Sequence, residues 1–173
     1  MKIGRSKARA ISEITIDQSI DMLGFSLTNM GNLVLPANAG VQLLANLPAN
    51  NDFSGETVLA VAGENIAQWE VVYLNADGTV YRSDASAAGT MPIKGIAVAA
   101  VAAAASGVFL IEGFYRTDGH GFTVGEFLYA SGAIGEITET APAVSGDQVQ
   151  RVGLAVNANV IWFRPDLTTL EVA

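Results

Sequence analysis

The sequence predicts an all-β fold: an antiparallel β-barrel or sandwich preceded by an extended or partly helical N-terminal arm. Short β-rich runs recur from Glu56 onward, turns containing glycine, aspartate or asparagine separate them, and 18 glycines supply sharp corners. Short strands at this spacing are typical of sandwiches and barrels. With 173 residues and 18.0 kDa, the chain is long enough to bury one hydrophobic core without disulfides or metals.

Residues 1–55 are expected to form an arm and a linker rather than part of the β domain. A short helix ending near Met22 and a strand are both compatible with the spacing of the isoleucines in the arm. The run 32–38 reads as a short strand that Pro36 stops. Residues 46–52 are rich in asparagine and contain a proline, which indicates a linker.

Residues 56–165 carry the expected β domain, and residues 166–173 form a C-terminal tail. Asp77-Gly78 marks a hairpin, because the turn needs positive φ angles that this pair adopts readily. The predicted strands, in chain order, are Thr57–Ala62, Val71–Leu74, Thr79–Arg82, Ile93–Val101, Val108–Tyr115, Phe122–Val124, Glu126–Tyr129, Glu136–Thr140, Gln148–Val156 and Val160–Arg164. The alanine run 97–105 also has helix propensity, but its neighbouring glycines and valines favour a strand.

A weak internal repeat runs through the β domain. The segment Val72–Val80 is similar to Phe127–Gly135, and Lys94–Val98 is similar to Val152–Val156, 58 positions further on. Each half reads as a strand, a glycine turn, a strand, an acidic loop and a Gly-aliphatic-Ala-Val strand. Two similar β units would build one barrel together; the alternative is a chance similarity in a chain rich in glycine, alanine and valine.

The chain is poor in charge. Charged residues make up 15% of it, against about 25% in typical soluble domains, and hydrophobic residues make up 50%. This shortage of charge predicts that part of the surface lies against other protein. The net charge of -8 opposes binding of nucleic acid by the body of the protein.

The basic residues are concentrated at the N-terminus, where Lys2, Arg5, Lys7 and Arg9 are four of the nine in the chain. As a solvated tail they need no function. As an arm, they are suited to lie on an acidic surface of a neighbouring protein or of a sister subunit.

No constellation of residues points to catalysis. The chain has no cysteine, which excludes disulfides and thiolate chemistry, and its single histidine, His120, lies between glycines. No Gly-x-Ser-x-Gly elbow and no glycine-rich phosphate loop is present. We therefore expect neither enzyme activity nor a cofactor or metal. The most apolar stretch, Ile96–Ala105, is too short to span a membrane.

Most aromatic residues fall within or beside predicted strands, where they serve the core or an interface. One region departs from this pattern, because Tyr115, His120 and Phe122 lie within or beside the loop Thr117–Gly121. These three residues are the candidates for contact with a receptor or glycan.

Blocks of turn and core residues stand out in the β domain. They are VVYLNADG (71–78), SDAS (83–86), TMP (90–92) before GIA (95–97), GFYR (113–116), GDQVQRVGLAV (146–156) and VIWFRP (160–165). Together these blocks resemble small head-decoration or head-fibre proteins of bacteriophage virions, and domains of their tail appendages. Residues 1–55 carry a looser similarity at GNLVLP (31–36).

The resemblance implies a β-rich, non-enzymatic structural protein that works as a symmetric homo-oligomer, with a trimer favoured. It implies the major capsid protein or another virion protein as the partner. The expected place is the virion, on the capsid surface rather than the tail, after assembly in the host cytoplasm. A tail-fibre or baseplate module that binds a host receptor is the alternative. The resemblance brings no catalytic residues with it.

Overall fold

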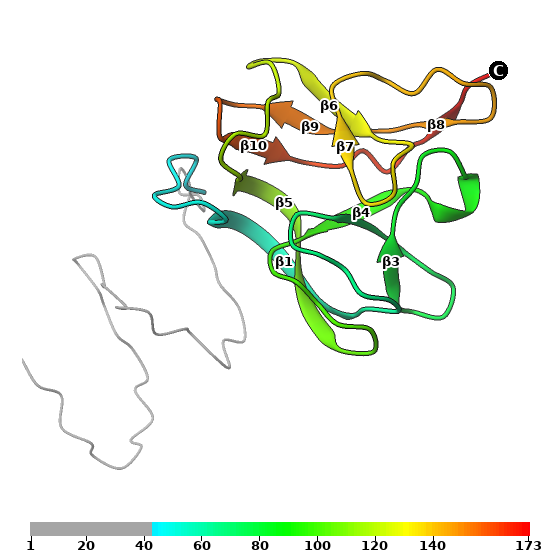
Figure 1. Cartoon of the computed structure of the whole chain (residues 1–173), viewed down its shortest axis with the longest axis horizontal. Coiled ribbons are helices and arrows are strands. Elements are labelled where there is room, and N and C mark those ends of the chain that lie inside the picture. Colours follow the sequence, from blue (N-terminus) through cyan, green and yellow to red (C-terminus); the bar gives the residue numbers. More distant parts are fainter. Residues whose placement is uncertain (1–42) are drawn as a thin grey trace, which may run out of the picture. The chain divides into compact units, whose positions relative to one another are not determined.

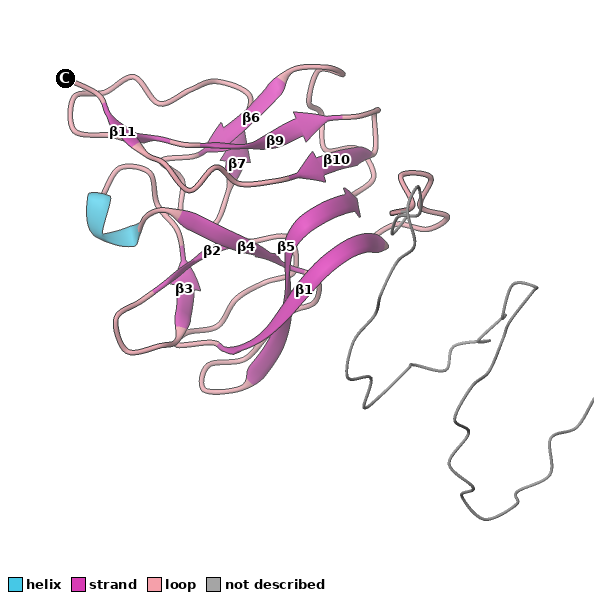
Figure 2. Ribbon diagram, turned by 180° about the vertical axis from the view of Figure 1, so that it is seen from behind, coloured by secondary structure: helices cyan, strands magenta, loops and turns pink. Residues whose placement is uncertain are grey.

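The computed structural model describes residues 43–173. The expected all-β class is confirmed. The strands form a strongly curled antiparallel sheet that resembles half of a barrel (Figures 1 and 2). The predicted arm lies, up to residue 42, outside the described residues.

The strands of the described chain are short, apart from two long ones. They are β1 (Phe53–Val61), β2 (Val71–Leu74), β3 (Val80–Arg82), β4 (Ile93–Ala97), β5 (Ser106–Arg116), β6 (Phe127–Ala130), β7 (Ile137–Thr138), β8 (Gln148–Val149), β9 (Arg151–Ala155), β10 (Val160–Phe163) and β11 (Leu170–Glu171), with a 3₁₀ turn at Ala88–Thr90. The β unit extends beyond the predicted range 56–165 at both ends. Strand β1 begins at Phe53, inside the range 1–55 predicted as arm and linker, and the C-terminal tail supplies β11, which pairs with β8.

Strand β5 joins two halves of the sheet. One of its edges pairs with β1 along most of its length. Its other edge pairs first with β4, at Phe109 and Leu110, and then with β10, from Gly113 to Arg116. The resulting order is β3-β2-β4-β5-β10-β9-β6-β7, with β1 alongside β5 at the margin of the sheet (Figure 2).

The two halves have the same strand order, as the internal repeat predicts, but the structure places Val72 equivalent to Leu128, one residue further along than the Phe127 of the sequence similarity. The first half has the order β3-β2-β4-β5 and the second the order β7-β6-β9-β10. The pairing register shifts after Val72 in β2 and after Leu128 in β6, at the equivalent place in each unit. These two residues face Gly95 and Gly153, the glycines that the sequence similarity aligns.

The equivalence extends to the residues that precede β2 and β6. Trp69 has φ 77° and Gly125 has φ 88°. Trp69 donates its N–H to Ala97 O at 2.9 Å, and Gly125 donates its N–H to Ala155 O at 2.8 Å. Glycine adopts a positive φ freely, whereas tryptophan is strained there. Stacking of Trp69 on Tyr115, with ring centroids 5.0 Å apart, offsets this strain.

Backbone hydrogen bonds link the outer ends of the two halves. Val71 N–H donates to Gly135 O at 2.9 Å, and Gly135 N–H donates to Ser83 O at 2.8 Å. Ala85 N–H donates to Ser131 O at 2.9 Å. The loop between β6 and β7 therefore forms hydrogen bonds with backbone groups at the start of β2 and just after β3. These bonds hold the two ends of the curled sheet together.

The inner faces of both halves meet in the main core. Its buried members are Val71, Ala85, Ile93, Ile96, Leu110, Tyr115, Leu128, Ala130, Ile137, Val152, Ile161 and Phe163. A smaller cluster comes from the first half, and its members are Ala62, Ile66, Val72, Val80, Ala97, Val101 and Phe109. Neighbouring residues such as Val71 and Val72 belong to different clusters, so the first half is apolar on both faces.

Two expected strands differ from the described structure, because one is shorter than predicted and the other is absent. Strand β4 ends at Ala97, and residues 98–105 form a loop, so the prediction of a strand to Val101 is wrong. Here Ile66 and Val101 exchange two backbone hydrogen bonds of 2.9 and 2.8 Å, which ties the loop to the segment before β2. Residues 122–124 are also a loop rather than a strand.

Candidate functional site

The cationic arm residues Lys2, Arg5, Lys7 and Arg9 lie outside the described residues. The three candidates for receptor contact lie within them. Tyr115 is fully buried, and its hydroxyl has no hydrogen-bond partner among residues 43–173. Burial raises the pKa of this phenol, and the side chain of Gln68, which lies near the hydroxyl but donates to Val98 O instead, opposes the shift. Tyr115 is therefore a core residue, and His120 and Phe122 are the two that a receptor can reach.

His120 is held in one neutral form by its neighbours. Phe122 N–H donates to Nδ1 at 3.0 Å, so Nε2 carries the proton and faces Asn157 O at 3.1 Å. Burial lowers the pKa of the imidazole, and the bond to Asn157 opposes this shift. The ring also stacks on Phe122, with centroids 5.0 Å apart. His120 thus fastens its loop to the turn between β9 and β10.

The surroundings of His120 do not assemble a catalytic relay. Asp118 pairs with Arg116, Nε to Oδ1 at 2.7 Å, and Phe122 and Asn157 contact the imidazole through backbone groups. Across residues 43–173, no group of three or more His, Asp or Glu side chains is placed to hold a metal ion. The contacts of this region hold the loop in place.

A different surface stands out at β1. In the described part of the chain, β1 pairs only with β5, so its other edge is free. The run Thr57–Val61 is uncharged, and Val58 and Leu59 are 44% and 69% exposed. Successive side chains of a strand point to opposite faces, so β1 is apolar on both. An exposed hydrophobic edge of this kind is a template for pairing with another chain.

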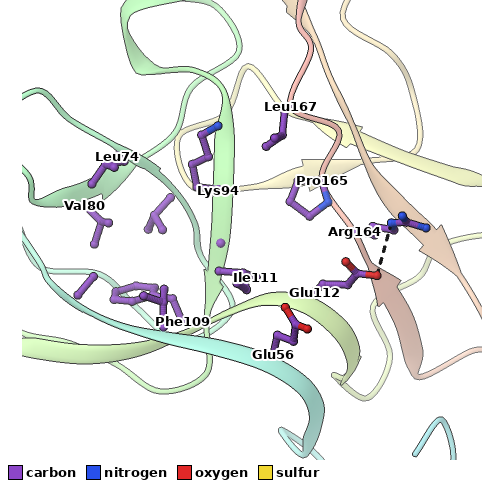
Figure 3. A pocket seen from close by; sticks show the side chains of 14 residues that line it. Glu56, Leu74, Val80, Lys94, Phe109, Ile111, Glu112, Arg164, Pro165 and Leu167 are labelled. Carbon is purple, nitrogen blue, oxygen red and sulfur yellow. Dashed lines mark ion pairs between the residues drawn. The ribbon is translucent and has the colours of Figure 1, made fainter. Parts of the chain in front are cut away.

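A hollow of about 460 Å³ lies beside β1, on the face of Val58 and Ala60 (Figure 3). Phe109, a member of the smaller cluster, lines it and is itself only 1% exposed. Leu74 and Leu167, at 57% and 70% exposure, also line the hollow. The lining is mostly apolar, its charged members are Glu56, Lys94, Glu112 and Arg164, and the size of the hollow suits side chains of a bound molecule.

Two carboxylates face each other beside this hollow. Glu56 of β1 lies directly opposite Glu112 of β5 in the strand register (Figure 3). Arg164 pairs with Glu112, Nε to Oε1 at 3.4 Å. No ion pair within residues 43–173 engages Glu56. Like charges directly opposite each other destabilise a sheet, so a further cation near Glu56 would be favourable.

A second hollow of about 480 Å³ lies on the face of Leu59. Phe53 and Val108 line it, together with residues of the alanine loop 98–105. Alanine side chains are too short to fill such a space, which leaves this face of β1 open. The free edge of β1 and its two hollows are called the β1 surface below.

The sequence reasoning identified Thr57–Ala62 as β-rich and apolar but assigned it no function. One available signal was the continuous run of apolar residues, which indicates a strand buried on both faces. The sequence gives no sign that Glu56 lies opposite Glu112, because this placement depends on pairing between strands that are far apart in the sequence.

A scan against protein-family models gives no match to this chain, and a search of curated proteins finds no relative. No helix within residues 43–173 is long and apolar enough to cross a membrane. The function is therefore inferred from the β1 surface and from the sequence blocks.

Proposed function

We propose that this chain is a non-enzymatic structural protein of a bacteriophage virion, which decorates or cements the capsid through its N-terminal arm and its subunit contacts. The β1 surface carries the proposal, because it is an unpaired strand with apolar side chains on both faces. Covering such a surface contributes about 25 cal/mol per Å² of apolar area, before the costs of association are deducted.

The blocks that resemble phage proteins lie at positions that build the fold. VVYLNADG covers β2 and its hairpin turn, and GDQVQRVGLAV covers β8 and β9. In the second block, Gln150 is buried, and Gly153 faces Leu128 across the paired strands β9 and β6. Because the phage-like blocks contain residues that build the fold, they support a structural role for the chain rather than a catalytic one.

In this proposal the chain is a homo-oligomer, with a trimer favoured, on the capsid surface rather than the tail. Removing the arm cations and three acids (Glu13, Asp17 and Asp21) from the chain totals of 9 and 17 leaves 5 basic and 14 acidic residues in 43–173. This balance of -9 suits contact of the described body with a basic partner. The cationic arm would contact an acidic patch on the major capsid protein, another virion protein or a sister subunit.

Occupancy on purified particles tests the proposal. Deletion of residues 2–9 and the substitution Leu59→Lys should each reduce the amount of this chain that co-purifies with capsids. Val144→Lys is the matched control, because Val144 is equally exposed at 70% but lies away from β1. Undiminished occupancy in both test variants would remove the arm and the β1 surface from the mechanism.

The alternative is a tail-fibre or baseplate module that binds a host receptor. The stacked pair of His120 and Phe122 favours it, because it places two rings on a surface loop. Glycan or host-cell binding that disappears in His120→Ala, with capsid occupancy unchanged, would favour this alternative over decoration. Binding that persists in His120→Ala would leave the loop without a role.

A further inference from the structure

The β1 surface offers two recognition elements at once: a row of free backbone groups and apolar space on both sides of it. We propose that β1 binds an extended segment of a partner protein, apolar on both faces and carrying a lysine or arginine, by strand addition. This inference rests on the proposed function, since it names the chemistry of the partner at that same surface.

The backbone of β1 can supply main-chain hydrogen bonds, which give strand addition its affinity. Strand β1 spans Phe53–Val61. Within the described chain, only one of its edges forms backbone hydrogen bonds with another strand, and that strand is β5. Backbone groups on its free side have no strand partner there, and an added strand would satisfy them. A segment as long as the uncharged run Thr57–Val61 matches the usual length of a strand.

The side chains of β1 specify an apolar partner. Val58 and Ala60 point to the hollow floored by Phe109, and Leu59 points to the hollow lined by Val108. An added strand lies beside these residues and alternates its own side chains between the same two faces. Apolar residues on both faces of the partner would therefore enter both hollows.

The carboxylate of Glu56 specifies a cation. Glu56 has no ion pair within residues 43–173, and it stands opposite Glu112, whose charge Arg164 shares. A lysine or arginine beside Glu56 would remove the repulsion between the two carboxylates. The apolar hollow next to it accommodates the aliphatic stem of such a residue.

Charge argues against the β1 strand of a second copy as the occupant. The β1 strand of another copy would bring its own Glu56 and no cation, because Phe53–Val61 contains neither lysine nor arginine. A neutral or basic segment of a different protein fits both the strand and its charge.

The test uses the full chain and two synthetic peptides of about eight residues, in which adjacent valines place an apolar side chain on each face of the strand and threonines flank them. One peptide carries a lysine near its start and the other a glutamate at the same place. The lysine peptide should bind and shift the backbone amide NMR signals of residues 56–61. Val58→Lys should weaken this binding about tenfold or more, because it places a charge in the hollow. Val144→Lys, at a residue that is 70% exposed and lies outside β1, should leave the affinity unchanged.

Charge reversal makes the test specific to Glu56. Glu56→Lys should lower the affinity for the lysine peptide by about two- to fivefold and raise the affinity for the glutamate peptide by a similar factor. Equal affinity of wild type for both peptides, or a chain that dimerises through β1 at the concentrations used, would overturn the inference. Because the peptides need no particle, loss of peptide binding with intact capsid occupancy contradicts this inference alone and leaves the proposed function standing.

Discussion

The carboxamide of Gln150 hydrogen-bonds both backbone polar groups of Ile93, a residue 57 positions away in the sequence. Ile93 N–H donates to Oε1 at 2.7 Å, and Nε2 donates to Ile93 O at 3.0 Å. Nε2 also donates to Asp166 O. The Gln150 side chain therefore pairs with β4 as a strand would, and it links the first half of the sheet to the second. Gln150 is only 1% exposed.

Gln150→Leu should destabilise the fold, because it keeps the bulk of the side chain and removes all of these bonds. Buried groups left without partners cost about 1–3 kcal/mol each. We expect the free energy of unfolding in urea to fall by roughly 2–4 kcal/mol. Gln68→Leu is the control, since it removes one part-buried bond to Val98 O and should cost about 1 kcal/mol or less. Equal losses of unfolding free energy in the two variants would show that the backbone groups of Ile93 find other hydrogen-bond partners.

Gly55 and Gly113 face each other across β1 and β5, where the strands approach too closely for side chains. A Cβ at position 55 would lie 2.1 Å from the carbonyl oxygen of Glu112 and 2.7 Å from the Cα of Gly113. Neither backbone atom can move without bending β5. Gly55→Ala should therefore lower the free energy of unfolding by roughly 2–3 kcal/mol, measured by thermal denaturation.

Gly89→Ala is the control for that substitution. A Cβ there would have nothing within 4 Å, and Gly89 has no positive φ. Its unfolding midpoint should match or slightly exceed that of the wild type, because alanine restricts the unfolded chain more than glycine does. A Gly55→Ala variant as stable as Gly89→Ala would contradict the close approach of β1 and β5.

Tyr115→Phe should stabilise the protein. The Tyr115 hydroxyl is buried without a hydrogen-bond partner in residues 43–173, and this burial is unfavourable. Phenylalanine keeps the stack on Trp69 and removes the unpaired group. We expect the free energy of unfolding to rise by about 1 kcal/mol. Tyr81→Phe is the contrasting control, because it loses the 3.2 Å bond to Asp77 and should gain nothing. A loss of stability in Tyr115→Phe would mean that the hydroxyl has a partner in the native protein.

Local turn chemistry made much of the fold predictable. Asp77-Gly78 forms the predicted turn, with Gly78 at φ 82°, and β2 lies at the predicted residues. The repeat was readable because the glycines at 95 and 153 hold equivalent places opposite β2 and β6. Patterns that a few neighbouring residues determine are visible in one sequence.

What the sequence did not disclose depends on distant partners. The alanine loop 98–105 is fixed by bonds between Val101 and Ile66, and alanine has too little side chain to signal a strand or a loop. The candidate site depends on the register that sets Glu56 opposite Glu112. That register includes a bulge after Glu56, which strand propensity alone does not locate.

His120 should make stability depend on pH in the mildly acidic range. Burial lowers its pKa in the folded protein below the ordinary value of 6.5. Above pH 6.5 the imidazole is neutral in both states and contributes its full stability. As the pH falls below 6.5, the unfolded chain binds the proton first, so the free energy of unfolding decreases until the pH passes below the folded pKa.

Protonation at Nδ1 would also break the bond that this nitrogen accepts from Phe122 N–H, and so loosen the loop from Asn157. Because the chain has one histidine, its ring signals in an NMR titration report this pKa without ambiguity. The folded pKa should lie below 6.5, and His120→Ala should remove the loss of stability that the wild type shows as the pH falls below 6.5. A titration midpoint at or above 6.5 would mean that the imidazole gains an acidic partner in solution, and the predicted dependence would then change sign.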